Sequence, residues 1–407
     1  MVGAGCRLPG GVDSLATYWE LLRSGGDAVR EVPADRWPID AWYDADPSHP
    51  GTMNTRRGGF LNEIDGFDPL FFGISPREAA YIDPQHRLLL EVAWEAIEDA
   101  GLTPRHLQAR TTGVFMAVYG RDYARLAALD PRSIDPYTTS GTHHSIAANR
   151  LSYWLDLRGP SLVVDTACSS SLVAVHLACQ SLRRGECDIA LCGGVNLMLA
   201  PEESVALTQW GMLAGDGRCK TFDARADGFV RGEGCGVLVL VRQRDAETAG
   251  HRMLAQIRGT AVNQDGRSNG LTAPNPAAQR TVIRQALHDA CVASAQIGYV
   301  EAHGTGTALG DPIEVEALAA ELRSGEAPSP CALGSVKASI GHLEAAAGIA
   351  GLLKTVLCLQ HGEIPPQCHL EELNPALVES ARRFRRRSRA RRTTSSRGRG
   401  APRSTST

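Results

Sequence analysis

Apolar runs that alternate with amphipathic stretches organise the first part of the chain. The runs are rich in Val, Leu and Ile and lack polar alternation, which is typical of strands in a sheet covered on both faces. We expect these strands at residues 112–118, 161–167, 188–199 and 234–242. Two helices are predicted with them, one closing at Gly185 after residues 169–184 and one starting at the Asp83-Pro84 pair and ending at Gly101.

The second part of the chain repeats this order of strands and helices. Strands are expected at residues 252–263, 298–303 and 332–339, and helices at residues 275–290, 311–325 and 342–362. The repetition predicts a duplicated α/β architecture with helices packed between sheets. We divide it into a first half, residues 1–242, and a second half, residues 243–380.

The end of the chain, residues 381–407, differs from the rest in composition. It holds eleven of the 42 Lys and Arg residues and none of the 45 acidic residues, and it lacks apolar periodicity, which predicts a disordered tail. The preceding residues are acidic overall, so the chain is a poor candidate for a nucleic-acid binder. The tail changes this little, because Phe384 is its only aromatic residue.

Cysteine usage and hydropathy indicate the compartment. The eleven cysteines form no C-x-x-C pair and no zinc-site spacing with histidine, so we expect free thiols, no metal and a reducing, cytoplasmic environment. No run of eighteen apolar residues predicts a transmembrane span. The start of the sequence is too short and glycine-rich in its apolar part for a signal peptide.

Three common enzyme motifs fail on inspection. Gly3-Ala4-Gly5 suggests a dinucleotide fingerprint, but Leu8 stands where its third glycine should be. No Gly-Lys pair forms a phosphate-binding loop, and the single G-x-S-x-G match, residues 266–270, does not stand at a sharp turn directly between a predicted strand and a predicted helix, as a nucleophile elbow must. Hydride transfer, nucleotide hydrolysis and serine hydrolase chemistry therefore lack their sequence signal.

Cys168 is the cysteine whose predicted position favours chemistry. An arbitrary buried cysteine is most often structural. Cys168, however, falls between a predicted apolar strand and a predicted helix, where free backbone N–H groups and the helix dipole favour a thiolate.

Two histidines in the second half have comparable settings. His303 precedes a Gly-Thr-Gly-Thr run, whose open backbone and threonine hydroxyls suit an extended ligand. His342 follows a predicted strand, five residues after Lys337, a lysine in apolar surroundings. A loop histidine or a surface cation is the ordinary interpretation of each residue alone.

One nucleophilic cysteine with two histidines suits carbon–carbon bond formation from thioesters. The thiolate accepts an acyl group, and two imidazoles can stabilise the enolate that forms when a second thioester loses CO₂. A cysteine protease would need one histidine with an orienting Asn or Asp, and would leave the second histidine unexplained.

The motifs DTACSSSL, EAHGTGT and SVKASIGHLEAAAG, in this order and spacing, resemble the β-ketoacyl synthase (ketosynthase) domain of modular type I polyketide synthases. The resemblance extends to FDPLFFGISPREAAYIDPQHR, GDGRCKTFDARADGFVRGEGCG and NQDGRSNGLTAPN, and runs from residue 1 to about residue 378. It implies a thiolase-like α/β fold with five layers, α-β-α-β-α, in a homodimer.

The resemblance also implies a role for each site residue. Cys168 matches the acyl-accepting nucleophile, His303 and His342 match the catalytic histidines, and Lys337 matches an auxiliary lysine that tunes the electrostatics. Thr305 and Thr307 match the threonines beside the phosphopantetheine arm. No resident coenzyme or metal is implied, because the substrates arrive on that arm of acyl carrier protein domains, which with other polyketide synthase domains are the expected partners.

Several departures from the family pattern keep a second hypothesis open. Ala338 and Ser339 stand where the family usually has Ser and Asn, and the first residues resemble the middle of the family's first strand. After residue 378 the family continues to a Phe/Gly-rich turn that supplies an oxyanion-hole donor, whereas here the sequence becomes arginine-rich. A catalytically impaired fragment or dimerisation remnant is therefore the alternative to an active condensing enzyme. A thiolase is disfavoured for lack of a second catalytic cysteine, and a decarboxylating loading domain because it carries Gln where Cys168 stands.

Overall fold

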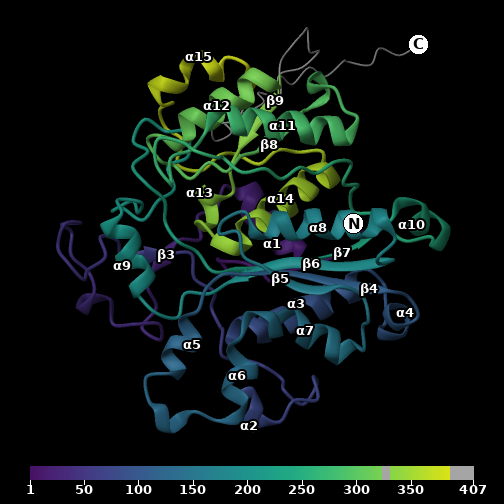
Figure 1. Cartoon of the computed structure of the whole chain (residues 1–407). Coiled ribbons are helices and arrows are strands. Elements are labelled where there is room, and N and C mark those ends of the chain that lie inside the picture. The colour runs from purple at the N-terminus through teal and green to yellow at the C-terminus, as the bar shows by residue number, and fades with distance from the viewer. Residues whose placement is uncertain (323–330, 386–407) are drawn as a thin grey trace, which may run out of the picture.

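Residues 1–322 and 331–385 are described by the computed structural model of the 407-residue chain (Figure 1). Its larger sheet has five strands in the order β1-β7-β6-β4-β5. The middle strand, β6, runs parallel to β4 and antiparallel to β7. The strands are β1 (Gly3–Arg7), β4 (Thr112–Val118), β5 (Ser161–Val164), β6 (Ile189–Asn196) and β7 (Gly234–Val241).

Helices cover both faces of this sheet, as the uninterrupted apolar runs predict. Helices α3 (Pro84–Asp99) and α7 (His144–Leu155) pack on one face, and α8 (Ser170–Arg184) and α14 (Ala347–His361) on the other (Figure 1). In β4, Met116 belongs to the core on the α3 side and its neighbour Phe115 to the core on the α8 side. Because successive side chains point to opposite faces, both sets must be apolar.

The smaller sheet has three parallel strands in the order β10-β9-β8. They are β8 (Tyr299–Glu301), β9 (Cys331–Gly334) and β10 (Phe384–Arg385). Helices α11 (Pro276–Ala290) and α12 (Gly310–Glu321) lie on its outer side, and α14 lies between the two sheets (Figure 1). The described residues thus form the five layers α-β-α-β-α that the family resemblance implies.

The remaining elements are short and connect these layers. A two-stranded sheet pairs β2 (Arg30–Glu31) with β3 (Arg57–Gly58). The other α-helices are α1 (Leu15–Ser24), α2 (Pro76–Ala79), α4 (Pro104–Gln108), α5 (Asp122–Ala127), α6 (Pro136–Thr142), α9 (Glu202–Gln209), α10 (Gln243–Ala249), α13 (Lys337–Ile340) and α15 (Val378–Ala381). In residues 1–322 and 331–385, no helix is long and apolar enough to cross a membrane.

Helices α3 and α8 have the capping residues that the sequence predicts. The Asp83 side chain accepts a hydrogen bond from the Gln85 N–H, and Pro84 takes the first helical position of α3. Gly185 ends α8 in the left-handed conformation, which glycine adopts without a steric cost.

Two predicted strands are corrected. Residues 252–263 form no strand. A strand needs a ladder of hydrogen bonds to a neighbour, whereas in the described residues this segment has main-chain to main-chain bonds only to Met1, through Leu254 and Ala255. The predicted strand 332–339 ends at Gly334, and Lys337 begins the short helix α13 instead. His342 accordingly lies in a loop after α13, five residues before α14 begins at Ala347.

The prediction that residues 381–407 are disordered is wrong for its first five residues. Ala381 is the last residue of α15, and Phe384 pairs with Cys331 of β9. The Phe384 ring is 7% exposed and packs in the core beneath α12. Burial of one large aromatic side chain thus orders residues 381–385, which composition alone predicts to be disordered. Residues 386–407 lie outside the described part.

Candidate active site

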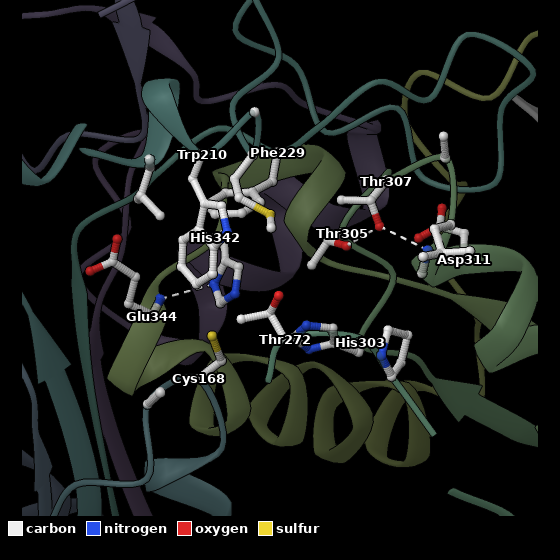
Figure 2. Close-up of a pocket in the computed structure, with 18 of the residues that line it drawn as sticks. Cys168, Trp210, Phe229, Thr272, His303, Thr305, Thr307, Asp311, His342 and Glu344 are labelled. Carbon is white, nitrogen blue, oxygen red and sulfur yellow. Dashed lines mark hydrogen bonds between the residues drawn. The ribbon is translucent and has the colours of Figure 1, made fainter. Parts of the chain in front are cut away.

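Three loops that are far apart in the sequence meet at one cavity of about 700 Å³. They are the turn between β5 and α8, the loop that follows β8, and the loop between α13 and α14. Figure 2 shows the side chains of Cys168, His303 and His342 directed toward this cavity, with Thr305 and Thr307 on its wall. The structure therefore brings together five of the six predicted site residues, and the sixth, Lys337, is buried and does not line the cavity.

Cys168 stands at a sharp turn between strand and helix. The residue before it, Ala167, has a φ of 54°, a left-handed conformation that costs a non-glycine residue free energy. The Ser170 hydroxyl holds the turn, since it donates to the Ala167 carbonyl at 2.6 Å and accepts the Thr166 N–H at 2.8 Å. The turn leaves the Cys168 thiol exposed at the floor of the cavity.

The surroundings of Cys168 do not favour a resting thiolate. Desolvation by the cavity walls raises the pKa of the Cys168 thiol, and the Glu344 carboxylate raises it further, while the Lys337 cation and the residue's own N–H act in the opposite direction. The net effect of these groups is opposite to the helix N-terminus effect that the sequence suggested.

His303 lies at the start of the glycine-rich loop after β8. The Glu314 carboxylate of α12 accepts the N–H groups of His303 at 2.6 Å and Gly304 at 2.8 Å, which fixes the backbone on which the imidazole stands. Desolvation in the cavity and the Lys337 cation lower the pKa of His303 to about 3. The ring is therefore neutral near pH 7.

His342 is 1% exposed, and its ring faces the cavity. Its Nδ1 accepts a hydrogen bond from the Glu344 N–H at 3.0 Å. A neutral imidazole that accepts at Nδ1 carries its proton at Nε2. Desolvation, Lys337, His303 and Arg231 together hold the pKa of His342 well below its usual range. The site thus offers a neutral Nε2–H donor.

Lys337 is 5% exposed and acts on the site through its charge. Its cation lowers the pKa of Cys168, His303 and His342 alike. A positive charge at this position keeps both imidazoles neutral and favours negative charge that develops in the cavity.

Thr305 and Thr307 lie beside His303 in the same loop. Their hydroxyl oxygens are 3.2 Å apart, and Thr307 also accepts the Gly310 N–H at 3.1 Å (Figure 2). Gly306 between them has a φ of 76°, and a Cβ there would lie 2.8 Å from the Lys220 backbone nitrogen. Glycine is therefore required for the loop to present both hydroxyls on the cavity wall.

Four residues of the site were missed by sequence reasoning. Three are acidic, Asp311, Glu314 and Glu344, and the fourth is Arg231, which pairs with Glu344. Glu314 lies in the first turns of a predicted helix directly after the His303 loop, and this placement was the available signal. Arg231 is 113 positions from Glu344, so nothing local indicates their contact.

No group of three or more His, Cys, Asp or Glu side chains in residues 1–322 and 331–385 is arranged to hold a metal ion.

Comparison with known families identifies two matching domains. The β-ketoacyl synthase N-terminal domain matches residues 1–246, and the β-ketoacyl synthase C-terminal domain matches residues 254–371.

Similar curated proteins are much longer than this chain. One component of the phenolphthiocerol/phthiocerol polyketide synthase of Mycobacterium tuberculosis is 56% identical over 384 residues, which are 94% of this chain and 25% of that protein. Another component of the same synthase is 56% identical over 386 residues, 94% of this chain and 21% of that protein. The chain thus spans about a quarter of the length of these relatives.

Two solved structures that superpose on this chain are ketosynthase domains. An oxazolomycin ketosynthase domain of Streptomyces albus superposes with a TM-score of 0.91 at 43% identity, covering 95% of this chain and 67% of that one. The ketosynthase from module 6 of the bacillaene synthase of Bacillus subtilis gives 0.84 at 41% identity, covering 92% and 63%. These likenesses confirm the predicted thiolase-like fold.

Proposed function

This chain belongs to the β-ketoacyl synthase family of condensing acyltransferases, and from that premise we propose that it catalyses decarboxylative Claisen condensation in polyketide assembly. Cys168 is the acyl acceptor, and His303 and His342 serve the decarboxylation. The observation that carries the proposal is the convergence of this thiol and two neutral imidazoles on one cavity.

The first half-reaction transfers an acyl chain to Cys168. Its sulfur attacks the carbonyl carbon of an acyl thioester on the phosphopantetheine arm of an acyl carrier protein. The bond between that carbon and the carrier sulfur breaks, and the carrier leaves as a thiol with the proton that Cys168 loses. The backbone N–H of Cys168 serves as a donor to the oxyanion of this step.

The second half-reaction forms the carbon–carbon bond. A malonyl-type thioester on a carrier protein loses CO₂, and the electron pair of the broken bond becomes an enolate. The Nε2–H of His342 and the imidazole of His303 donate hydrogen bonds to the enolate oxygen. The enolate carbon then attacks the acyl-Cys168 carbonyl, and the Cys168 sulfur leaves as a thiolate that takes up a proton from solvent water. A β-ketoacyl thioester remains on the carrier.

The other site residues assist these two steps. The buried Lys337 cation lies close enough to lower the pKa of both histidines, so it keeps them as neutral donors. Thr305 and Thr307 present hydroxyls on the same wall, and we assign them to the phosphopantetheine arm. Neither half-reaction requires a resident coenzyme or metal.

Acyl carrier protein domains and other polyketide synthase domains are the proposed partners, together with a second copy of this chain. The homodimer is supported by β5, the outer strand of the larger sheet, because an edge strand can pair with its counterpart in another copy. The exposed Tyr153 of α7, the helix packed beside β5, would add apolar area to that interface. No disulfide joins any two of the eleven cysteines, all of which lie in the described residues, and this fits the reducing cytoplasm that we propose as the location.

The test follows acyl transfer and condensation separately. The chain is incubated with an acyl pantetheine thioester, and mass spectrometry locates the acyl group; malonyl-acyl carrier protein is then added and the β-ketoacyl product is measured. We expect acylation at Cys168 followed by product, and neither with Cys168→Ala. Acylation without any condensation would instead support the catalytically impaired fragment, and acylation elsewhere would refute the proposal.

A further inference from the structure

The backbone beside Arg231 pairs directly with the loop that carries His342. The His342 N–H donates to the Val230 carbonyl at 2.7 Å, and the Gly232 N–H donates to the His342 carbonyl at 2.8 Å. Residues 230–232 thus hold the main chain of His342 from both sides. These bonds fix the position of its Cα but leave open which ring nitrogen carries the proton.

The side chain of Arg231 continues the contact two residues further along the loop. Its Nε lies 2.5 Å from one oxygen of Glu344 and its Nη2 lies 3.1 Å from the other, while Nη1 donates to the Ser204 hydroxyl at 3.0 Å. The Arg231 and Glu344 side chains are 5% and 9% exposed. A bidentate pair of this kind fixes the orientation of both partners.

Glu344 needs such a restraint because its backbone is strained. Its φ is 47°, in the left-handed region that a residue with a Cβ seldom adopts. This conformation directs the Glu344 N–H at Nδ1 of His342, 3.0 Å away. If Glu344 relaxed to an ordinary φ, its peptide would turn and Nδ1 would lose its donor.

We propose that Arg231 is a positioning residue that, through its ion pair with Glu344, keeps His342 in the tautomer protonated at Nε2. The role in catalysis rests on the proposed function, since only the Nε2–H tautomer presents a donor to the enolate. The structural part of the inference, the control of the tautomer, stands on the contacts alone. Nothing in it requires Arg231 to touch substrate.

The pair also limits an unfavourable charge effect at the nucleophile. The Glu344 carboxylate is one of the groups that raise the pKa of Cys168. Arg231 lies against that carboxylate and is itself stabilised as a cation by Glu344, Asp122 and Glu203. Removing the guanidinium would leave a buried carboxylate without its partner next to the reacting sulfur, so acylation of Cys168 would slow as well.

A second buried pair offers a matched control. Arg36 donates to both oxygens of Glu233, each at 3.1 Å, and these side chains are 3% and 0% exposed. Neither residue lines the cavity. Arg36→Gln therefore removes a bidentate ion pair of similar burial without touching the Glu344 turn, and reports what the loss of such a pair does to stability alone.

The experiment compares the full chain with its Arg231→Gln, Arg231→Lys, Glu344→Gln and Arg36→Gln variants. Nitrogen-15 NMR of histidine-labelled protein identifies the protonated nitrogen of His342, whose signals are assigned by their loss in His342→Ala. The rate of CO₂ release from malonyl-acyl carrier protein is measured on the same samples, per folded protein. Thermal melting reports the stability of each variant.

We expect Arg231→Gln to show both tautomers of His342 and to release CO₂ at least about tenfold more slowly. Compared with Arg231→Gln, Arg231→Lys should recover part of the Nε2–H tautomer and part of the CO₂ release rate. Arg36→Gln should have a lower melting temperature but keep the single tautomer of His342. An unchanged tautomer in Arg231→Gln overturns the inference. If that variant does not fold, Glu344→Gln decides in the same way, because it retains the backbone donor and the side-chain volume but loses the charge. If the unmodified chain releases no CO₂, the proposed function fails, while the tautomer still tests Arg231.

Discussion

The imidazole rings of His303 and His342 meet edge to face, with their centroids 5.5 Å apart and their planes at 84°. The two residues come from different loops, one after β8 and one after α13, and each is held by an acidic residue of the site. Glu314 accepts the backbone N–H of His303, and Glu344 donates its own N–H to His342. Perpendicular neutral rings can direct two donors at one oxygen, which is what an enolate requires.

The first prediction separates the two histidines from acyl transfer. His303→Ala and His342→Ala should each lower the rate of CO₂ release by about 10²–10³, the usual effect of losing one oxyanion donor. Both variants should still accept an acyl group on Cys168, because the sulfur performs that attack. Acyl-enzyme formation is followed by mass spectrometry and CO₂ release by a coupled assay. Normal condensation by the double variant would contradict the assigned roles.

The second prediction concerns the pH dependence of Cys168. Because the pKa of its thiol is raised above the ordinary value, less thiolate is present at pH 7.5 than in an ordinary cysteine. The rate of alkylation by iodoacetamide should therefore keep rising beyond pH 9, whereas a lowered pKa would give a plateau near neutrality. Peptide mapping at each pH measures the rate.

Cys291 is the internal control for accessibility, since it and Cys168 are the two cysteines classed as exposed among the eleven. It lies outside the active-site cavity. Iodoacetamide should label both residues, but an acyl pantetheine thioester should acylate Cys168 alone. Equal acylation of the two would show that accessibility, rather than the site, directs the reaction.

The third prediction uses a buried histidine outside the site. His86 in α3 is 1% exposed, and neither ring nitrogen has a hydrogen-bond partner among the described residues. Desolvation, with the charges of Arg150 and His144, lowers the pKa of His86 to about 3. In the unfolded chain its pKa is near the ordinary value of about 6.5, so between these values the unfolded state binds the additional proton and stability falls as the pH falls.

Replacing His86 with leucine should remove this loss. The difference in free energy of unfolding, His86→Leu minus the unmodified chain, should be about 2 kcal/mol larger at pH 5 than at pH 7.5. Urea unfolding at both pH values measures it. His288→Leu is the control, because His288 is exposed in the folded chain. A difference for His86→Leu that does not change with pH would show that the native ring takes up the proton.

Local sequence signals predicted the elements whose stability is local. Asp83 caps the start of α3 and Gly185 caps the end of α8, and both caps involve only neighbouring residues. The positions of these helix ends could therefore be predicted. The strand expected at residues 252–263 failed because strand formation depends on a partner elsewhere in the chain. The same applies to Phe384, whose burial depends on packing beneath α12.

The candidate site divides in the same way. Cys168, His303 and His342 could be found because each lies beside a turn that small or glycine residues in the sequence indicate. Arg231 and Glu344 could not, because their contact arises only when residues 230–232 pair with the His342 loop. The upward shift of the Cys168 thiol pKa could not be predicted for a related reason: a helix N-terminus is visible in the sequence, but the desolvating walls come from three separate loops.

The last prediction tests the glycine-rich loop that presents the two threonines. Gly306 is anchored on both sides, since its N–H donates to Asp311 at 3.1 Å and its carbonyl accepts the Gly228 N–H at 3.0 Å. Its φ of 76° and the nearby Lys220 backbone leave no room for a side chain. Gly306→Ala must therefore strain or shift the loop, at a cost of roughly 1–3 kcal/mol.

If Thr305 and Thr307 bind the phosphopantetheine arm, that shift should lower kcat/KM for acylation of Cys168 by an acyl pantetheine thioester by about tenfold or more. Alkylation of Cys168 by iodoacetamide, which has no such arm, should change much less. Gly298→Ala is the matched control, because a Cβ at Gly298 meets no heavy atom within 4 Å. Equal values of kcat/KM for Gly306→Ala and Gly298→Ala would show that Thr305 and Thr307 do not bind the substrate arm. A parallel loss of thioester and iodoacetamide reactivity in Gly306→Ala would instead mean that the shift reaches Cys168 itself.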